Sequence, residues 1–404
     1  MPVVKAVSAA DAARPAGEDS AGKRYEAANR LKAARIAASL DDRLLAAQVI
    51  CGGIDGSGPL GADMRAILEE CPPGGILLFR YNLNAEKDHV RAFLAECTAL
   101  VAAASGLPHD PAAVENNAAP ETGEAAEAVP IPPLIAVDHE GGAVFRFGPG
   151  VARLPAAGAY GELAREQGRE TALALVEEDA RRSAQEIRDL GITLNLAPLA
   201  EPLTPGNRAF LEDRSYGDDV VFVEAAAAAF IRGMAAGGIG CAVKHFPGTA
   251  GLDPHLAPST LAGDRESLAV LTRPFANLIR AGMVSALMVS HSRVPARDGE
   301  NIASLSAAVI GDWLRGELGF TGLVIADDFS MAAASAAGLS PEAAALRSLA
   351  AGADMVIVWP GNIRRTHRAL LTALGNGSLP RERLREAAER IIGEKIRRGI
   401  IAGG

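Results

Sequence analysis

Polar side chains stand at the ends of four apolar segments of this sequence. They occur in Asp138-His139-Glu140, Lys244-His245, Ser290-His291 and Asp327-Asp328. Carboxylates and imidazoles that meet at one place can transfer protons or attack an electrophilic carbon. Any one of them could instead cap the helix that follows, and for Asp328 alone that interpretation is equally good. Four such ends in one chain indicate a catalytic or binding site.

A second pair of chemically useful residues lies just downstream of Lys244-His245. Asp253 and His255 are two residues apart among the turn-forming residues that begin at Gly248. A carboxylate beside an imidazole orients the ring and favours its protonated form, which suits proton donation to a leaving oxygen near neutral pH. A solvated loop is the ordinary alternative for an isolated pair of this kind. Its position after a polar strand end favours a general acid.

Arg214 is a third candidate, in the segment from Asn207 to Gly217. Arginine offers a planar fork of donors that suits hydroxyls or carboxylates of a ligand. The same side chain could equally hold its own loop together through Asp213 or Asp218, so both interpretations stay open.

The candidates must be positioned by a regular framework, and the apolar runs predict one. Eight β-branched or aliphatic runs alternate with longer Ala/Leu/Glu/Arg stretches, as is typical of βα units around a buried parallel sheet. The runs cover residues 48–51, 75–79, 134–138, 193–197, 241–245, 286–291, 323–327 and 355–359. They predict an α/β fold, a single-domain (β/α)8 barrel of the TIM type. The active site of such a barrel gathers at the C-terminal ends of its strands, where the polar ends would meet.

The sequence also predicts how the chain is divided. Residues 1–38 are Ala-rich and charged and are expected to form an N-terminal helical arm, and residues 39–404 form the barrel. The segment at about 103–130 is rich in Ala, Pro, Glu and Asn and cannot bury much apolar surface, so we expect an exposed insertion. The helical stretch 384–401 closes the barrel.

Composition excludes several classes of protein. Apolar residues make up 49% of the chain and charged residues 22%, which predicts a globular protein. A net charge of −9 without a Lys/Arg-rich stripe argues against a nucleic-acid partner. The chain has no apolar run long enough for a membrane span, and its N-terminus lacks the apolar core of a secretory signal. A cytoplasmic protein with no membrane partner is therefore expected.

The cysteines predict no metal centre. The four of them, Cys51, Cys71, Cys97 and Cys241, are scattered without a C-x-x-C spacing. We interpret them as buried free thiols rather than zinc ligands or disulfides.

The order of several segments resembles that of glycoside hydrolase family 3, over about residues 40–398. The similarity is to its single-domain bacterial β-N-acetylglucosaminidases, which trim cell-wall fragments. The matching segments are Gly74-Gly75-Ile76-Leu77-Leu78-Phe79-Arg80-Tyr81-Asn82, Asp138-His139-Glu140-Gly141-Gly142, Asn195-Leu196-Ala197-Pro198, Asp213-Arg214-Ser215-Tyr216-Gly217, Lys244-His245-Phe246-Pro247-Gly248 and Gly319 through Asp327-Asp328-Phe329-Ser330-Met331.

This resemblance implies a retaining glycosidase. The first aspartate of Asp-Asp-Phe-Ser-Met, Asp327, would be the nucleophile that forms a covalent glycosyl-enzyme. His255, steered by Asp253, would be the acid/base in place of the second carboxylate of most glycosidases. Neither a metal nor another cofactor is implied, and water is the expected acceptor, with phosphate as an alternative.

The resemblance also implies how a small carbohydrate is held. Asp138, Arg214, Lys244 and His245 match the residues that bind the hydroxyls of the non-reducing sugar. Arg146 and His291 match further positions of the pocket. Only 4% of residues are aromatic, so a long cleft with many stacking platforms is not expected, and a small exo-acting pocket fits better. We expect a monomer.

Three departures from the family pattern concern the pocket. Thr249-Ala250 follow Lys244-His245-Phe246-Pro247-Gly248 where His-Gly is usual, and the loop to Asp253 is about two residues shorter. Ala143 stands where Arg is common, and Leu199-Ala200-Glu201-Pro202 replaces the usual acidic position.

Other functions remain open at the level of sequence. Within the family, a β-glucosidase or β-xylosidase is the nearest alternative, and a sugar-binding barrel without activity is another. Outside it, Lys244 could form a Schiff base as in an aldolase, or His139, His245 and His291 could bind a metal together with Asp327.

Overall fold

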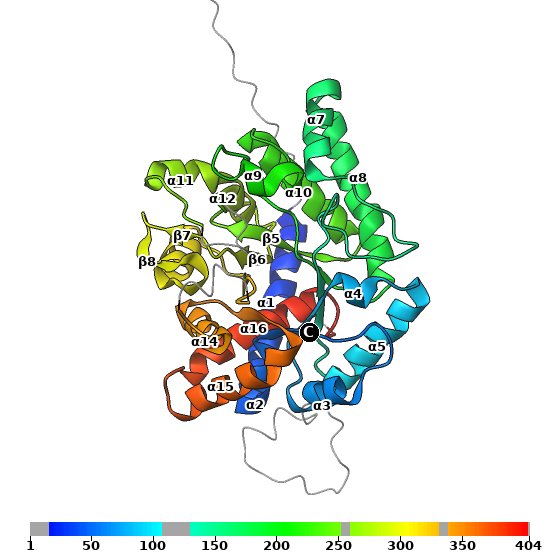
Figure 1. Ribbon diagram of the computed structural model, residues 1–404, viewed down its shortest axis with the longest axis vertical. Coiled ribbons are helices and arrows are strands. Elements are labelled where there is room, and N and C mark those ends of the chain that lie inside the picture. Colours follow the sequence, from blue (N-terminus) through cyan, green and yellow to red (C-terminus); the bar gives the residue numbers. More distant parts are fainter. Residues whose placement is uncertain (1–15, 107–129, 252–258, 331–337, 403–404) are drawn as a thin grey trace, which may run out of the picture.

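The structure, a computed structural model, describes residues 16–106, 130–251, 259–330 and 338–402. Figure 1 shows its helices arranged around a central group of strands. The helices are α1 (Ala16–Ser39), α2 (Asp42–Gln48), α3 (Ala62–Glu70), α4 (Arg80–Leu83), α5 (Lys87–Ala104), α7 (Ala157–Gln167), α8 (Arg169–Arg188), α9 (Arg208–Leu211), α10 (Val220–Ala236), α11 (Arg265–Leu271), α12 (Arg273–Arg280), α14 (Pro341–Ala351), α15 (Ile363–Gly375) and α16 (Arg381–Arg397). Short 3₁₀ segments lie at η1 (Glu212–Arg214), η2 (Ala303–Leu305) and η4 (Pro360–Asn362), and a π-helical segment at η3 (Ala308–Glu317).

The strands confirm the predicted barrel. Eight parallel strands close in the order β1-β10-β9-β6-β5-β4-β3-β2. They are β1 (Ile50–Gly53), β2 (Gly75–Leu78), β3 (Leu134–Val137), β4 (Leu194–Asn195), β5 (Gly240–Phe246), β6 (Ala286–Val289), β9 (Leu323–Ala326) and β10 (Met355–Val358). Each overlaps one of the eight predicted runs, although β1 continues to Gly53 and β5 covers one residue more at each end. The antiparallel pair β7 (Arg293–Val294) and β8 (Asp298–Ile302) follows β6 and has no counterpart in the prediction.

The strands read as continuous aliphatic runs because they are buried on both faces. Every residue of the eight barrel strands is buried. Helices cover the outside of a parallel barrel and side chains fill its inside, so neither face selects polar residues. Several surrounding helices begin at side-chain caps, as where Asp41 accepts from the Leu44 amide and Asp219 accepts from the Val221 and Phe222 amides.

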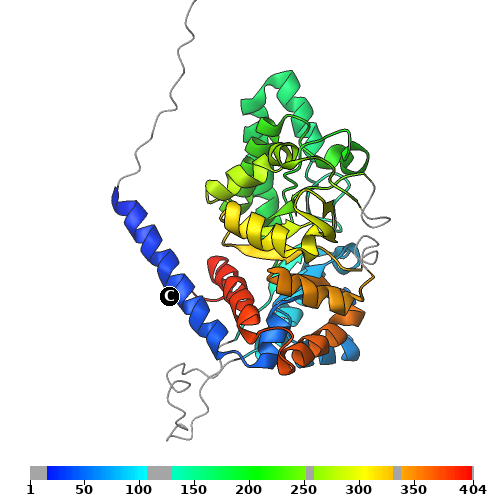
Figure 2. The same ribbon diagram turned by 90° about the vertical axis from the view of Figure 1, so that its left-hand side faces the viewer.

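The N-terminal and C-terminal helices pack against each other. Figure 2 shows α1 beside α16 on one side of the barrel. Ala33, Ala37 and Leu40 of the N-terminal segment are buried there. α1 therefore covers most of the predicted N-terminal arm, and residues 1–15 lie outside the described residues. α16 corresponds to the closing helix predicted at 384–401 and begins three residues earlier.

Residues 103–105, which the sequence assigned to the exposed insertion, belong instead to α5 and its C-terminal cap. α5 continues to Ala104, and the buried Ser105 hydroxyl donates to the Ile131 carbonyl at 2.9 Å. Residues 103–105 are thus part of the packed framework. Residues 107–129 lie outside the described residues, and the exposed insertion stays a prediction for them.

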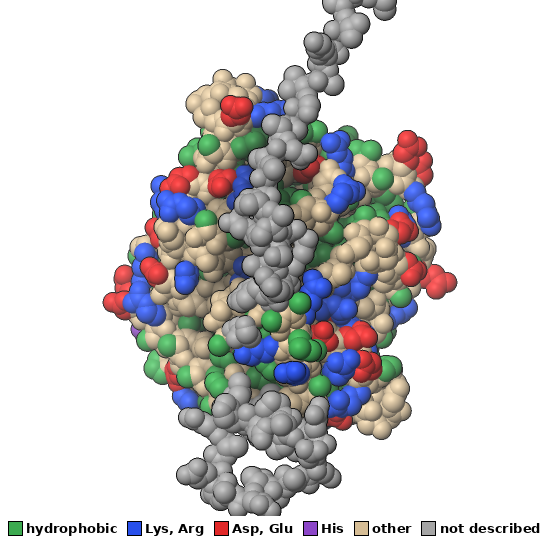
Figure 3. Space-filling model, turned by 180° about the vertical axis from the view of Figure 1, so that it is seen from behind, with side chains coloured by type: hydrophobic (Ala, Val, Ile, Leu, Met, Phe, Trp, Pro, Cys, Tyr) green, Lys and Arg blue, Asp and Glu red, His purple; other side chains and the backbone are tan. Residues whose placement is uncertain are grey.

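Charged side chains of both signs lie on the surface, and the four cysteines are buried. On the face shown in Figure 3, Lys and Arg side chains are interspersed with Asp and Glu. Within the described ranges, no helix is both long and apolar enough to cross a membrane. Cys51, Cys71, Cys97 and Cys241 are buried and free, which confirms the predicted free thiols.

Candidate active site

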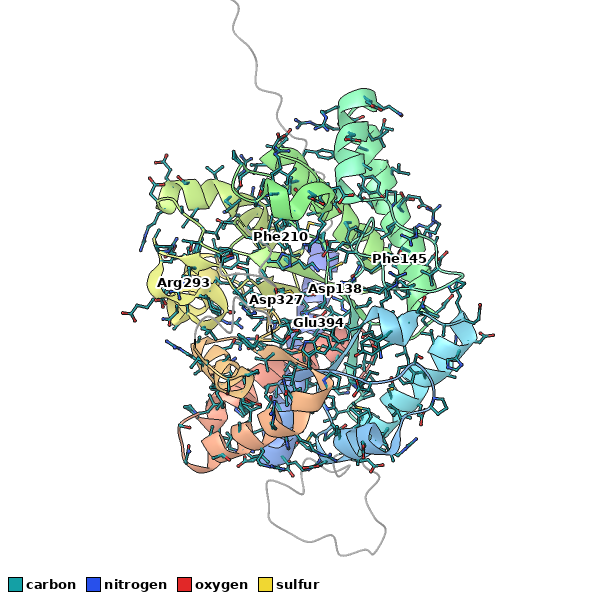
Figure 4. All side chains as sticks on the ribbon, in the orientation of Figure 1. Asp138, Phe145, Phe210, Arg293, Asp327 and Glu394 are labelled. Carbon is teal, nitrogen blue, oxygen red and sulfur yellow. The ribbon has the colours of Figure 1, made fainter. Side chains whose placement is uncertain are left out.

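A cavity of about 410 Å³ opens at the C-terminal ends of the barrel strands. Figure 4 shows Asp138 and Asp327 near the centre of the ring of helices, with Phe210 of α9 close by. The cavity brings together the predicted nucleophile and all the predicted sugar-binding residues: Asp138, Arg146, Arg214, Lys244, His245, His291 and Asp327. The predicted acid/base pair, Asp253 and His255, lies outside the described residues.

Asp327 follows the last residue of β9 and is held in its ionised form. Burial opposes the charge, but His291, His245, the Asp328 amide and Lys244 outweigh it, and the pKa of Asp327 is lowered. The Asp328 backbone N–H donates to Asp327 Oδ1 at 2.8 Å. A carboxylate on a rigid strand end, ionised and facing a cavity, is suited to nucleophilic attack.

His291 lies beside Asp327, and both of its ring nitrogens are within hydrogen-bonding distance of protein groups. Burial lowers the pKa of His291, although the nearby Asp327 carboxylate opposes this shift. Its Nε2 lies 2.9 Å from the Asp328 carbonyl, which can only accept, so Nε2 carries the proton. Nδ1 lies 2.7 Å from the Ser304 hydroxyl. Both ring nitrogens are occupied, so His291 shapes the pocket and is not available as a metal ligand.

Lys244 is the centre of a buried ion cluster. Its Nζ lies 2.6 Å from Asp138 Oδ1 and 2.7 Å from Glu140 Oε1. Burial opposes the charge of Lys244, but Asp138 and Glu140 outweigh it and raise the pKa of Lys244. An ammonium that stays protonated has no lone pair for a carbonyl carbon, so this geometry disfavours the aldolase alternative.

Arg214 joins the same cluster through Glu140. Its Nε and Nη2 donate to the two Glu140 oxygens at 2.9 and 2.8 Å, a bidentate geometry that fixes the guanidinium plane. Burial raises the pKa of Glu140, but Lys244 and Arg214 outweigh it and the net shift is downward. The loop alternative through Asp213 or Asp218 was wrong, because Asp218 pairs instead with Arg208.

Glu140 can reach this cluster because of the tight turn that follows it. Gly141 has a φ of +97°, and a Cβ there would lie 2.1 Å from the Pro155 carbonyl oxygen. The turn is closed by the Val144 amide, which donates to the Gly141 carbonyl at 2.9 Å. A side chain at Gly141 would therefore push the turn away and displace Glu140.

Glu201 is a site residue that the sequence analysis did not select. It is fully buried, and its Oε1 lies 2.7 Å from His245 Nδ1 while its Oε2 accepts from the Thr249 hydroxyl at 2.7 Å. The backbone amides of His245 and Thr249 also donate to it. The carboxylate orients His245 with Nδ1 as the donor and leaves Nε2 for a ligand. The signal was a lone acid within the apolar stretch after Asn195, which we treated as a departure from the family pattern.

The metal alternative is not supported by the position of His139. Its ring is buried between Phe145 and Phe147 at centroid distances of 5.6 and 5.1 Å, and its Nε2 lies 2.9 Å from the Ser183 hydroxyl. His139 thus points into the packed layer outside the barrel and not toward His245 and His291. No group of three or more potential ligands that could hold a metal occurs among the described residues.

Asp328 and two aromatic residues complete the wall of the cavity. Asp328 accepts from Trp359 Nε1 and from the Ser330 hydroxyl, so it orders the rim next to Asp327. Phe79 and Trp359 line the cavity. Neither was predicted from sequence as a site residue, because an aromatic residue at a strand end has no charged or metal-binding group that distinguishes it from the apolar strand.

The cavity chemistry agrees with the relatives found by sequence comparison. Residues 65–393 match the family model described as glycosyl hydrolase family 3 N terminal domain. A beta-hexosaminidase of Methylococcus capsulatus is 34% identical over 325 residues, which are 78% of this chain and 84% of that protein. A beta-hexosaminidase of Chromobacterium violaceum is 35% identical over 337 residues, 82% of this chain and 83% of that protein.

Solved structures give the same result. A glycoside hydrolase family 3 beta-N-acetylglucosaminidase from Paenibacillus sp. superposes with a TM-score of 0.76 at 31% identity, over 90% of this chain and 64% of that chain. This chain thus spans less than two thirds of that protein. A beta-N-acetylhexosaminidase from Beutenbergia cavernae superposes with a TM-score of 0.72 at 26% identity, over 89% of this chain and 99% of that chain. Together with the barrel and its cavity, these comparisons show that the chain belongs to glycosyl hydrolase family 3.

Proposed function

We propose that this protein is a retaining, exo-acting glycosidase that releases β-linked N-acetylglucosamine from small glycosides or cell-wall fragments. The observation that carries the proposal is Asp327, an ionised carboxylate at a strand end that faces a pocket lined by Asp138, Lys244 and Arg214. The names of the relatives, beta-hexosaminidase and beta-N-acetylglucosaminidase, support the choice of sugar.

In the first step, Asp327 attacks the anomeric carbon of the bound sugar. A bond forms from a carboxylate oxygen to that carbon as the bond to the leaving oxygen breaks, and His255 gives its proton to this oxygen. In the second step, His255 takes a proton from water, whose oxygen displaces Asp327 from the anomeric carbon. Two inversions give net retention.

The polar side of the pocket would hold the sugar that reacts. Asp138 and Glu140 supply acceptors, Lys244 and Arg214 supply donors, and Glu201 fixes His245 so that its Nε2 can contact a hydroxyl. Since these groups already contact one another, their orientation is set before the ligand arrives. An array of this size fits one terminal sugar, which favours removal of single residues from chain ends.

The first experiment is hydrolysis of nitrophenyl β-glycosides of N-acetylglucosamine, glucose and xylose by the purified protein. We expect preference for the N-acetylglucosaminide. Preference for glucoside or xyloside would instead favour the nearest alternative within the family. Asp327→Asn is the matched control, since it keeps the size of the side chain and removes the nucleophile. It should abolish turnover without changing the melting temperature, and substantial residual activity would exclude Asp327 as nucleophile.

The acid/base role of His255 has its own test. His255→Ala should slow alkyl glycosides far more than nitrophenyl glycosides, because a good leaving group needs little protonation. Equal losses on both would contradict the role. If the wild-type protein binds sugar and turns over none of these substrates at any pH, the alternative of a sugar-binding barrel takes its place. Product analysis in phosphate buffer distinguishes water from phosphate as the acceptor.

We further propose a monomeric, cytoplasmic protein whose partner is a small carbohydrate. No nucleic-acid or membrane partner is part of this proposal, and no cofactor is needed for the steps above. Size-exclusion chromatography with light scattering tests the oligomeric state, and fractionation of the producing cells tests the location.

A further inference from the structure

Three aromatic side chains, Tyr81, Phe79 and Trp359, form a row at the rim of the pocket that we call the aromatic ridge. The ring centroids of Phe79 and Trp359 lie 4.8 Å apart and those of Phe79 and Tyr81 5.7 Å apart, with interplanar angles of 21° and 14°. Among residues whose exposure is described, Tyr81 and Trp359 are the two exposed aromatic side chains, at 43% and 39%. Both of these exposed rings stack with Phe79.

The polar atoms of the aromatic ridge are already bound by the protein. Trp359 Nε1 donates to the Asp328 carboxylate, and the Tyr81 hydroxyl donates to the Ile54 carbonyl at 3.1 Å. These contacts fix the rings and leave their faces as the part that can meet a ligand. Rings held in one orientation lose little conformational entropy on binding.

The aromatic ridge adjoins the nucleophile on the side of the pocket away from Lys244. Asp328 links the two, because its carboxylate receives Trp359 Nε1 and its backbone N–H donates to Asp327 Oδ1. Phe79 follows β2 and Trp359 follows β10, and these two strands flank β1 in the closed barrel. Lys244 is on β5, which lies across the barrel from β1. We call the side of the pocket around Lys244 the polar half, although Phe210 lies against Arg214 there, and the side with the aromatic ridge the aromatic half. Asp327 lies beside the aromatic half.

We propose that the aromatic ridge binds the leaving group of the substrate and that this leaving group is a second, uncharged sugar ring. The proposal rests on the proposed function, in which the reacting sugar fills the polar half. A pyranose has a face of C–H groups that packs on an aromatic ring while its hydroxyls stay in water at the edge. Sugar bound to the ring of Trp359 would lie next to the bond that Asp327 breaks.

The charges around the aromatic ridge fit a neutral leaving group. Asp328 is bound to Trp359 itself, and burial together with the nearby Asp55 carboxylate raises the pKa of Tyr81. Two carboxylates beside the rings would repel an anionic group. They can accept hydrogen bonds from sugar hydroxyls at the edge of the rings.

The test compares two N-acetylglucosaminides that differ in the second ring alone. One is N,N′-diacetylchitobiose and the other is methyl β-N-acetylglucosaminide, and both leave as alkyl alcohols that need a proton. Trp359→Ala should lower kcat/KM for the disaccharide by roughly ten- to a hundredfold, mainly through KM, since burial of an aromatic face is lost. The loss on the methyl glycoside, which has no second ring to pack on Trp359, should be much smaller than the loss on the disaccharide. Trp359→Phe keeps a ring without the N–H and should retain most of the preference.

Leu175→Ala is the matched control, because Leu175 is 41% exposed on α8 and lies outside the residues that line the pocket. It should change neither substrate. The proposal would be overturned if Trp359→Ala and Trp359→Phe both lowered kcat/KM equally for the two substrates. Trp359 would then act only through its hydrogen bond to Asp328. No loss on either substrate would overturn it as well.

Calorimetry separates failure of this proposal from failure of the proposed function. Asp327→Asn should bind the disaccharide more tightly than N-acetylglucosamine, and Trp359→Ala in that background should remove the difference. If the wild-type protein cleaves neither substrate but this difference is seen, the assigned activity is wrong and the ridge remains a sugar-binding surface. If the disaccharide gains no affinity over the monosaccharide, the ridge proposal is wrong whatever the activity.

Discussion

Two buried carboxylates at opposite ends of the barrel are surrounded by cations, and only one of them belongs to a pocket. Glu140 lies at the C-terminal ends of the strands with Lys244 and Arg214. Asp354 precedes β10 at the other end and pairs with Arg315, Arg383 and Arg390. By burial and charge alone the two clusters look alike.

They differ in what remains for a ligand. Asp354 Oδ2 accepts from Arg315 and from the Val324 amide, and Oδ1 accepts from Arg383 and Arg390. Arg383 also donates to backbone carbonyls at positions 349 and 353. This cluster is filled by protein and ties α16 to the barrel.

The cluster around Glu140 is left partly open. The side chains of Asp138 and Arg214 are 24% and 20% exposed, and both line the cavity. Unused hydrogen-bonding capacity that faces a cavity therefore distinguishes a binding site from a structural ion cluster, and a buried charge does not do so by itself.

Lys244→Met tests whether the cluster around Glu140 is a binding site, and it has the largest expected effect. Loss of the ammonium leaves Asp138 without its cation and Glu140 with Arg214 alone, so both sugar binding and the charge around Asp327 change. We expect kcat/KM for the N-acetylglucosaminide to fall roughly a hundredfold or more, and the protein to lose about 3–5 kcal/mol of stability. Steady-state kinetics and urea unfolding measure the two effects. A stable variant with unchanged kcat/KM would mean that the open cluster is structural too.

Glu201→Gln tests the positioning of His245 with a smaller expected effect. The carboxylate meets donors on both oxygens, so the amide NH2 of Gln must face either Thr249 or His245 as a second donor. We expect kcat/KM to fall roughly ten- to a hundredfold through loss of about 1–3 kcal/mol of hydrogen bonding. The pH profile of kcat/KM should shift with it, since the partner of the His245 ring has changed. A profile of unchanged shape with only a lower melting temperature would indicate a purely structural role.

The eight barrel strands could be predicted from sequence because burial on both faces makes each strand a continuous aliphatic run. The ends of those runs gave Asp138, Lys244, His245, His291 and Asp327, which the closed barrel brings to one cavity. The extra hairpin β7–β8 was missed, since Arg293 to Ile302 contains few apolar residues and carries no alternating pattern.

The partners of the site residues could not be predicted in the same way. Glu140 and Glu201 act through contacts with residues at least 44 positions away in the chain, and such contacts depend on how the barrel closes. Conversely, His139 has a side chain suited to a catalytic or metal site and follows a barrel strand. It directly follows Asp138, however, and successive side chains along extended backbone point to opposite faces. The alternation of side chains turned it into the packed layer around Phe145 and Phe147.

Asp354→Asn is the counterpart of Lys244→Met at the closed cluster. An amide cannot neutralise three guanidinium groups, so the free energy of unfolding should fall by about 3–5 kcal/mol. Urea unfolding measures this loss, and kcat/KM should stay unchanged at temperatures where the variant is folded. Glu178→Gln, which breaks the exposed pair with Arg181, is the control and should leave the unfolding midpoint in place. A loss of activity without loss of stability would show that the two ends of the barrel are coupled.

Lys395→Met tests a buried cation that has no carboxylate partner among the described residues. Its Nζ donates to Gln48 Oε1 at 2.7 Å, and no ion pair involving it is found within the described ranges. Burial lowers the pKa of Lys395 from 10.5 to about 7. Between these two values the unfolded chain binds a proton that the folded chain has lost, so this residue destabilises the fold fully below pH 7 and progressively less toward pH 10.5.

Replacement by Met should therefore stabilise the protein where replacement of Lys244 by Met destabilises it. We expect a gain of a few kcal/mol in the free energy of unfolding at pH 6.5, shrinking by about 1.4 kcal/mol per pH unit above pH 7. Urea unfolding of both proteins at pH 6.5, 8 and 9.5 measures the trend, and activity should not change because Lys395 lies outside the pocket lining. A gain that is the same at every pH would mean that Lys395 keeps its ordinary pKa in the folded chain, and that buried cations here need no carboxylate partner.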